Sequence, residues 1–280
     1  MLEPGEPVLL EHDGAVFALI RRSDPVDAIT PYGYGGPVGR EVGAFWSAYD
    51  EWCRANDVVS TFVRFHPLYA NARDAPIHVE PLAPTVAWRL EQDDLFAGMH
   101  LNHRRTVRKA RKAGVTVTAT EGVGDFVPLY EQTMRRAGAA PFYFFASEYW
   151  QALGRTQLVR FDAHLGDDIV ASALCLASPP WLHYHLGASS DEGRKLGAMT
   201  LLFLEGATWA RERGYERFHL GGGVGGREDS LHEFKRRFDP GGLRDAAVGK
   251  AVHDEQAYAR LGGNAASLDG YFPAYRRIQA

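Results

Sequence analysis

The stretch Ile169–Leu176 constrains the fold more than any other part of the sequence. It reads IVASALCL, and Ser172 is its only polar residue. A strand with one face in water alternates apolar and polar residues, whereas a strand covered on both faces is apolar throughout. We therefore expect a sheet with helices packed on both of its faces.

The segments around this strand indicate a mixed α/β sheet. From Val115 onward the predicted order is β-α-α-β-β-β-α-β-α-β, with a long amphipathic helix between a three-stranded meander and the next strand. Asp125 and Ser147 are expected caps of the two helices before the meander, and Gly138 and Gly214 are helix stops. The predicted elements are strands 115–120, 157–164, 169–177, 181–188, 217–220 and 243–252, and helices 125–137, 147–153, 198–213 and 229–238.

The N-terminal part repeats this theme in shorter form. Asp13-Gly14 between apolar runs predicts a hairpin over Val8–Arg22. A helix (41–56), two strands (58–65 and 85–90) and a second helix (93–113, ended by Gly114) follow. We therefore predict two related halves, residues 1–114 and 115–252, with the segment from about 253 to 280 returning to the first.

Composition restricts the class of protein. The chain has 280 residues, 45% of them hydrophobic and 24% charged, which is ordinary for a globular protein with a proper core. Cys53 and Cys175 lie in apolar or helical patterns, as buried thiols of a reducing compartment do. No signal-peptide pattern and no run of 18 apolar residues is present, so we expect a cytoplasmic protein. The net charge of −4 argues against a dedicated nucleic-acid coat and leaves room for a local basic patch.

Two short stretches could bind phosphate. The glycine run Gly221–Gly226 lies between a strand and a helix, where backbone amides can bind anions, although a flexible turn explains it equally well. It is not a dinucleotide-binding loop, because no acidic residue follows to hold a ribose. The sequence from Arg194 matches in part the [RQ]xxGx[GA] loop of acetyl-CoA-dependent transferases, but Met199 stands where Gly or Ala is required.

A basic run covers His100–Lys112. Arg104, Arg108 and Arg111 share one helix face at i, i+4, i+7 spacing, and Lys109 is adjacent. The run is either a solvated helix face or a surface that binds the phosphates of a polyanion.

Histidine pairs raise the question of a metal. His100 with His103, His183 with His185, and His219 are the candidates, and the second pair would share a strand face. The sequence contains no HExxH, no CxxC and no acidic third ligand beside them, so we expect no metal. The GxSxG elbow of serine hydrolases is also absent.

The segment Asp229–Phe238 is an amphipathic helix with an unusual lysine. Asp229 can cap it, Phe234 and Phe238 lie four residues apart on one face, and Lys235 adjoins that apolar stripe. An ordinary surface helix is the alternative interpretation.

At this point the sequence resembles the FemABX-like branch of the GNAT-fold acyltransferases. The similarity covers most of the chain in the expected order. The matching stretches are TPYGYGGP (30–37), HRRTVRKARKAGV (103–115), LYEQTMRRAGAAPFYFF (129–145), HYHLGASS (183–190), LGAMTLLFLEGATWARERGYERFHLGGG (196–223) and DSLHEFKRRF (229–238).

The resemblance implies two tandem GNAT-like halves with the active-site cleft at or near the second. Its best-known members transfer amino acids from aminoacyl-tRNA to an amine of a peptidoglycan precursor. Relatives in small-molecule biosynthesis, including that of antibiotics, use the same donor with other acceptors. This chain is shorter than the bridge-forming members and contains no coiled-coil arm for tRNA.

By the same resemblance, Phe234 and Lys235 correspond to the FK pair beside the reacting ester. Arg104, Arg108 and Lys109 are the candidates for binding tRNA phosphates. The candidate substrate-binding residues are Tyr32 and Tyr34 of the loop that reaches the precursor's phosphates, and Tyr143, Tyr149, Tyr184 and His185 of the acceptor channel.

We therefore expect an aminoacyltransferase that forms an amide and needs no cofactor beyond its donor substrate. An acyl-CoA-dependent N-acyltransferase is the alternative enzyme, and Met199 speaks against it. A non-catalytic GNAT-like binding module is the alternative of another class, favoured if Lys235 faces solvent away from any cleft.

Overall fold

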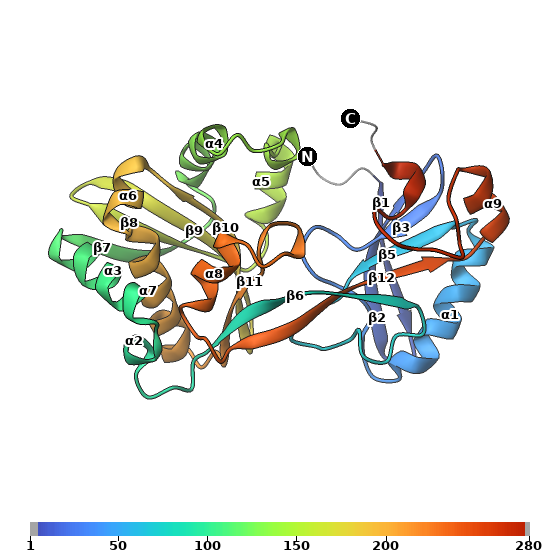
Figure 1. The fold of residues 1–280 in the computed structure, drawn as a ribbon, viewed down its shortest axis with the longest axis horizontal. Helices are drawn as coiled ribbons and strands as arrows, with labels where there is room; N and C mark the ends of the chain where they lie inside the picture. Colours follow the sequence, from blue (N-terminus) through green and yellow to red (C-terminus); the bar gives the residue numbers. More distant parts are fainter. Residues whose placement is uncertain (1–4, 278–280) are drawn as a thin grey trace. The chain divides into compact units, whose positions relative to one another are not determined.

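The structure is a computed structural model that describes residues 5–277, and it contains two compact units (Figure 1). The central unit is Pro84–Arg244, and the terminal unit combines residues 5–83 with 245–277. Strands β6 (His78–Arg89) and β12 (Leu243–Val252) each run from one unit into the other. The predicted boundary at Gly114 falls inside the central unit, because the helices α2 (Leu95–Gly98) and α3 (Leu101–Lys112) pack against α7 (Ala198–Glu212). Residues 1–4 and 278–280, included in the predicted segments, lie outside the described residues.

The central unit contains a mixed sheet in the order β6-β11-β10-β9-β8-β7. Strands β8 to β10 form the predicted antiparallel meander, and β7 pairs with β8 in antiparallel fashion. Strands β10 and β11 are parallel, and β11 and β6 are antiparallel. The fold class predicted from the sequence, a mixed α/β sheet, is confirmed. The strands are β7 (Val115–Glu121), β8 (Leu158–Leu165), β9 (Asp168–Ser178), β10 (Trp181–Ser189) and β11 (Arg217–Gly221).

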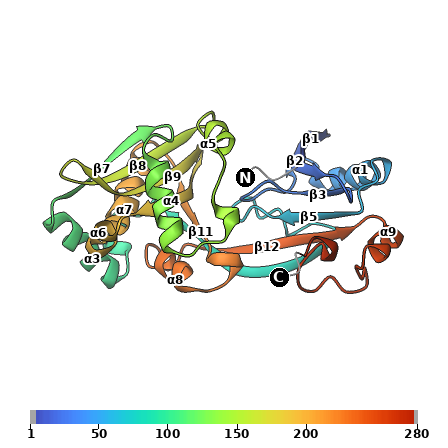
Figure 2. The ribbon, with the colours of Figure 1, turned by 90° about the horizontal axis from the view of Figure 1, so that it is seen from above.

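Helices cover both faces of this sheet, as the apolar stretch in β9 requires. Phe161 and Ala173 belong to the core under α3 and α7, whereas Leu158 and Leu174 belong to the core under α4 and α5. In Figure 2, seen from above, α4 crosses in front of the strands. The helices are α2 (Leu95–Gly98), α3 (Leu101–Lys112), α4 (Phe126–Arg136), α5 (Ser147–Leu153), α6 (Asp191–Leu196), α7 (Ala198–Glu212) and α8 (Ser230–Arg236), with a short 3-10 turn η1 (Pro141–Tyr143).

The helix predicted over 93–113 is two helices, α2 and α3. Met99 has an extended backbone (ψ 150°), and His100 becomes the N-cap of α3 by accepting a hydrogen bond from Asn102 N. The backbone N–H of His100 donates to the carbonyl of Arg237 at 2.9 Å. The break therefore follows from a long-range contact that local periodicity does not contain.

Strand β6 begins at His78, earlier than the predicted Thr85. Pro81 and Pro84 lie inside it, and because proline has no N–H to donate, it usually argues against a strand. Ser147 does not cap α5 as predicted, since its hydroxyl bonds to Glu148 and Ala146 is the N-cap.

The terminal unit contains a sheet in the order β1-β2-β3-β5-β12, with α1 packed on it. The predicted hairpin is confirmed: Asp13 and Gly14 both have positive φ, as its two-residue turn requires. None of the helices formed by residues 5–277 is long and apolar enough to cross a membrane. The elements are β1 (Glu6–His12), β2 (Ala15–Arg22), β3 (Asp27–Ile29), β4 (Val38–Gly39, paired with β2), α1 (Val42–Ala55), β5 (Ser60–Arg64) and α9 (Glu255–Arg260).

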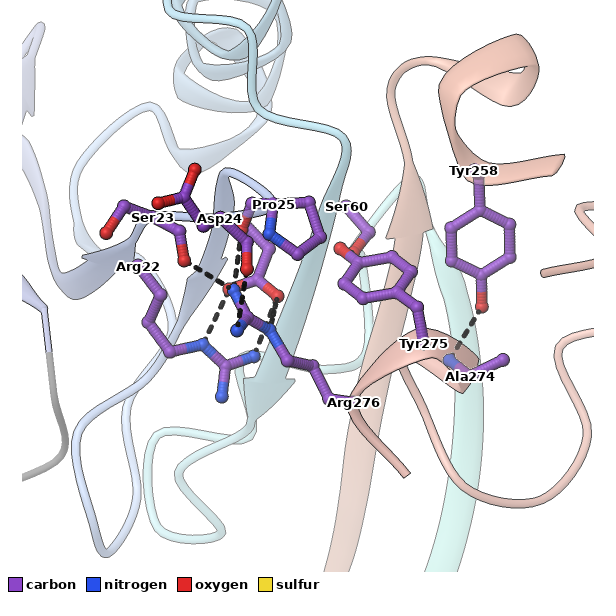
Figure 3. Close-up of polar contacts among 10 residues, drawn as sticks. Arg22, Ser23, Asp24, Pro25, Ser60, Tyr258, Ala274, Tyr275 and Arg276 are labelled. Carbon is purple, nitrogen blue, oxygen red and sulfur yellow. Dashed lines mark hydrogen bonds and ion pairs between the residues drawn. The ribbon is translucent and has the colours of Figure 1, made fainter. Parts of the chain in front are cut away.

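The C-terminal segment is tied to this unit by Arg276, which Figure 3 shows beside Ser23 and Pro25. Asp27 is fully buried, and it accepts hydrogen bonds from Arg22 at 2.6 Å and Arg276 at 3.0 Å. Arg276 also donates to the carbonyls of Ser23 (3.0 Å) and Pro25 (2.6 Å). One anion therefore anchors two arginines that are far apart in the sequence.

We predict that Asp27→Ala lowers the free energy of unfolding by about 3 kcal/mol, because it leaves two partly buried guanidinium groups without their anion. Urea unfolding followed by circular dichroism measures the change. Glu6→Ala removes an exposed partner of Arg21 in the same unit and serves as the control, expected to change stability by less than about 0.5 kcal/mol. Equal effects of the two variants would contradict an anchoring role for Asp27.

Candidate functional site

The candidate site lies where strands β10 and β11 stop pairing. They are in parallel register only from Trp181–Arg217 to His183–His219, after which β10 continues beside β9 alone. The register of β10 shifts between Tyr184 and Leu186, as in a β-bulge. Bulges redirect side chains and are common beside active sites. Tyr184 is therefore at the start of the segment of β10 that β11 no longer covers.

Lys235 of α8 reaches this point. Its side chain is buried, with 6% of the residue exposed, and Nζ donates a hydrogen bond to the carbonyl of Gly222 at 2.7 Å. Nζ also lies 5.4 Å from the centroid of the Tyr184 ring. An ammonium has three N–H groups, and among residues 5–277 the Gly222 oxygen is the one hydrogen-bond acceptor it uses. Lys235 thus keeps N–H donors for another oxygen.

Burial also changes the charge of this lysine. Desolvation lowers the pKa of Lys235 to about 8, and the carboxylate of Asp229 partly opposes that shift. Asp229 is held at the N-terminus of α8 by accepting from His232 N at 2.9 Å, as predicted for the cap. Lys235 is consequently mostly an ammonium at neutral pH.

Phe234 faces the opposite way, toward α3. Its carbonyl lies 2.8 Å from His103 Nε2, and its ring centroid lies 5.0 Å from that of His103. Phe203 of α7 is next to both Phe234 (6.2 Å) and Tyr184 (5.0 Å), measured between ring centroids. Phe234 and Tyr184 therefore both pack against the ring of Phe203, and Lys235 lies next to Tyr184.

A pocket of about 360 Å³ begins at Tyr184 and extends along the uncovered part of β10. Arg136 of α4 donates to the Ser189 carbonyl at 2.6 Å and lies 3.3 Å from Asp191. Arg194 is the second cation of the lining. The lining residues are Thr133, Arg136, Ala137, Tyr184, Gly187, Ala188, Ser189, Arg194 and Met199.

The partial phosphate loop predicted at Arg194 is part of this pocket. Gly197 joins α6 to α7 with φ +77°, and a Cβ there would come within 2.1 Å of Thr106 Cγ2 on α3. Only glycine fits such a left-handed and crowded position. Met199, the residue that departs from the motif, lines the pocket.

The basic run forms most of α3, and its apolar side is buried. Lys109 donates to the carbonyl of Lys195 at 2.6 Å, next to the pocket residue Arg194. Arg108 is exposed, with its guanidinium 5.2 Å from the centroid of Phe96, and Arg104 is half-buried. The cations predicted for phosphate binding therefore lie on the helix that holds the pocket loop.

The other predicted residues on β10 face α5 and β11. His185 is hydrogen-bonded to Tyr149. His183 Nδ1 lies 3.2 Å from Nδ1 of His219, and Nε2 of His219 lies 3.0 Å from Thr85 Oγ1. Burial lowers the pKa of both His183 and His185 to about 4, so both are neutral at pH 7. Within residues 5–277 no three His, Cys, Asp or Glu side chains are grouped to hold a metal ion.

Three predicted tyrosines lie elsewhere. Tyr143 is in η1, where its carbonyl accepts a hydrogen bond from Tyr130 at 3.0 Å. Tyr32 and Tyr34 are in the terminal unit, with 38% and 39% of their surfaces exposed. Asn71 holds their loop by donating to the carbonyls of Gly35 and Pro37, at one wall of a pocket of about 410 Å³ within that unit.

Sequence reasoning missed two residues of the site. Arg136 had no distinguishing pattern, because its role depends on where α4 ends beside β10. His103 was grouped with the basic run and the metal candidates. Its spacing from Val107 and Ala110 (i, i+4, i+7) was the signal that it lies on the buried stripe, and it is 4% exposed.

Solved structures share this fold at low sequence identity. FemX is 15% identical with a TM-score of 0.68, over 92% of this chain and 90% of that one. The C-terminal domain of a putative lysylphosphatidylglycerol synthetase from Agrobacterium fabrum is 17% identical with a TM-score of 0.64, over 91% and 86%. A tandem GNAT protein of clavulanic acid biosynthesis is 14% identical with a TM-score of 0.50, over 86% and 79%. The predicted fold of two tandem GNAT-like halves, and the resemblance to FemABX-like proteins at the level of fold, are confirmed.

Sequence comparison gives the family. No curated protein is detectably similar to the chain in sequence. The model of the acetyltransferase (GNAT) domain matches residues 96–236, just over half of the chain. The matched span includes the basic helix α3, the junction of α6 and α7, and Lys235. The chain therefore belongs to the acetyltransferase (GNAT) domain family.

Proposed function

We propose that this protein transfers an amino acid from aminoacyl-tRNA to an amine and so forms an amide. The observation that carries the proposal is the buried ammonium of Lys235, held by the Gly222 carbonyl and the Tyr184 ring where β10 and β11 part. The fold shared with FemX supports the choice among acyltransferases.

The chemistry asks little of the protein beyond orientation and charge stabilisation. An aminoacyl ester is already activated, so the acceptor nitrogen attacks its carbonyl carbon directly. As the C–N bond forms, negative charge develops on the carbonyl oxygen, and the unused N–H groups of Lys235 are suited to bind it. When the C–O bond breaks, the 3′-oxygen of the tRNA leaves and takes up the proton that the amine loses. No covalent enzyme intermediate is needed.

The surroundings of the pocket fit a polyanionic donor. Arg136 and Arg194 line it, and Arg104, Arg108 and Lys109 are carried by the helix that supports its loop. Each phosphate that such cations neutralise adds binding free energy by releasing counterions.

The acceptor is proposed as an amine of a peptidoglycan precursor or of a small metabolite. Tyr184, Tyr149 and His185 come from the elements that would form its channel, and Tyr32 and Tyr34 stand on the loop that the FemABX resemblance assigns to the precursor's phosphates. Incubating the protein with charged tRNA and a cell extract, followed by mass spectrometry of the acylated product, tests the donor and identifies the acceptor together.

Acyl-CoA is the second candidate donor, and a specific observation favours it. Arg194, in the last turn of α6, and Gly197, the N-cap of α7, occupy two positions of the phosphate-loop sequence motif, and Arg194 lines the pocket. Met199 opposes it by lining the pocket where the motif requires a small residue. Calorimetric titration with acetyl-CoA and with charged tRNA distinguishes the two donors. The burial of Lys235 counts against a non-catalytic module.

We predict that Lys235→Met lowers kcat by a factor on the order of 10²–10³, the usual loss when one well-placed oxyanion donor is removed. Methionine keeps most of the apolar stem, so the fold should survive. Lys235→Arg should restore only part of the rate, because its planar group is bulkier. Arg236→Met, which removes an exposed cation from the same helix, is the control and should behave as wild type.

Turnover of Lys235→Met within about threefold of wild type would correspond to only about 0.65 kcal/mol of barrier and would exclude this role for the lysine.

The pH dependence follows from the charge state of the lysine. We predict that kcat falls as the pH rises through about 8, because the ammonium is the active form and its pKa is lowered to about 8 by burial. In Lys235→Arg this descending limb should disappear, since a guanidinium stays charged. A rate that instead rises through pH 8 in wild type but not in Lys235→Arg, measured with the same acceptor, would show that the neutral amine of Lys235 acts.

The affinity for tRNA should depend on salt concentration because cations of α3 bind its phosphates. Changing Arg104, Arg108 and Lys109 together to glutamine is expected to weaken tRNA binding and to reduce the slope of log K against log [salt] by about 2–3, as three phosphate contacts are lost. Filter binding over a range of salt concentrations measures this. The control changes Arg135, Arg213 and Arg236, three exposed arginines outside α3. If both triple variants bind alike, α3 is an ordinary solvated helix.

A further inference from the structure

The C-terminal end of α8 is capped by residues of α3. Carbonyls of the last helical turn have no partner within their own helix. Phe238 N donates to the carbonyl of Lys235 at 3.1 Å, and the carbonyl of Phe234 is bonded instead by His103 Nε2 at 2.8 Å. One residue past the end of the helix, the carbonyl of Arg237 accepts from the backbone N–H of His100.

This hydrogen bond fixes the state of the imidazole. A carbonyl oxygen can only accept, so Nε2 of His103 carries the hydrogen. Desolvation lowers the pKa of His103 to about 4, and the ring is neutral at pH 7. Three charged or titratable groups face it: Arg237 and His100 lower the pKa further, and Glu233 raises it.

The capped peptide is the one that leads into the candidate catalytic lysine. The carbonyl of Phe234 and the backbone N–H of Lys235 belong to the same planar peptide group. Rings on both sides hold His103, with centroids 5.0 Å from Phe234 and 4.4 Å from Phe238. Among residues 5–277, the Lys235 ammonium donates to the Gly222 carbonyl and lies near the face of the Tyr184 ring, and the carboxylate of Asp229 is the charge that acts on its pKa.

We propose that His103 is a positioning residue, which holds the Phe234–Lys235 peptide so that the lysine ammonium stays buried between Gly222 and Tyr184. Its importance for catalysis rests on the proposed function of Lys235, whereas its effect on the lysine's surroundings does not. The pair His103→Gln and His103→Leu tests the hydrogen bond, because the amide of glutamine can still donate to the Phe234 carbonyl and leucine cannot.

The first measurement needs no turnover. Competitive labelling of amines across a pH series, read by mass spectrometry, gives the pKa of Lys235 directly. We expect about 8 in wild type and in His103→Gln. In His103→Leu the last turn of α8 loosens and water reaches the ammonium, so the pKa should rise by at least about one unit toward its ordinary value. His164→Leu, which removes an exposed hydrogen bond between His164 of β8 and Thr118 of β7, is the control.

The second measurement is transfer from charged tRNA. In His103→Leu, kcat should fall about 10- to 100-fold while KM for the donor stays within about threefold, since the lysine is displaced and the pocket is not. His103→Gln should stay within about threefold of wild type. If His103→Leu does not fold, His103→Met takes its place, because methionine also has no N–H with which to donate a hydrogen bond.

The proposal is overturned if His103→Leu, or His103→Met in its place, keeps the pKa of Lys235 at about 8. It is also overturned if His103→Gln changes that pKa as much as His103→Leu does. A rise in that pKa in a protein that does not use charged tRNA would support the positioning role and refute the proposed function, so the two failures are distinguishable.

Discussion

The parting of β10 and β11 is the constraint on which the candidate site depends. Because the two parallel strands stop pairing after His183–His219, the rest of β10 has no paired strand from residues 5–277 on that side. At this point the ring of Tyr184 packs against that of Phe203, and the ammonium of Lys235 from α8 lies near the Tyr184 ring. A continuous β10–β11 ladder would leave neither a pocket along β10 nor a reason to bury a lysine there.

Helix α3 connects the charged surface of the central unit to the buried lysine. Its basic side carries Arg108 and Lys109, while its buried stripe carries His103, which caps the helix of Lys235. Thr106, on the same helix, is the side chain that requires glycine at position 197 beside the pocket. One helix therefore supports the pocket loop and the candidate catalytic residue together, so a change in how α3 packs would reach both.

Local signals in the sequence were enough for the fold and for part of the site. Two-sided apolar strands, the Asp13-Gly14 turn and the cap at Asp229 each act through neighbours in the chain, and the structure has them where they were expected. Features that depend on distant contacts could not be predicted. The predicted helix over 93–113 breaks at His100 because the N–H of His100 donates to the carbonyl of Arg237. Arg136 lies at the pocket because it donates to the Ser189 carbonyl at the end of β10.

Lysine suits this position for a reason that arginine does not share. A buried ammonium loses hydration that a single carbonyl and an aromatic face replace only in part, and its pKa falls accordingly. In the proposed reaction, that incomplete solvation leaves the cation ready to bind an oxygen whose negative charge appears only during the reaction, so the interaction would be stronger in the transition state than in the ground state. A guanidinium would satisfy more acceptors beforehand and spread its charge over a plane. The same physical property that makes Lys235 costly to bury is thus the one on which its proposed role in acyl transfer depends.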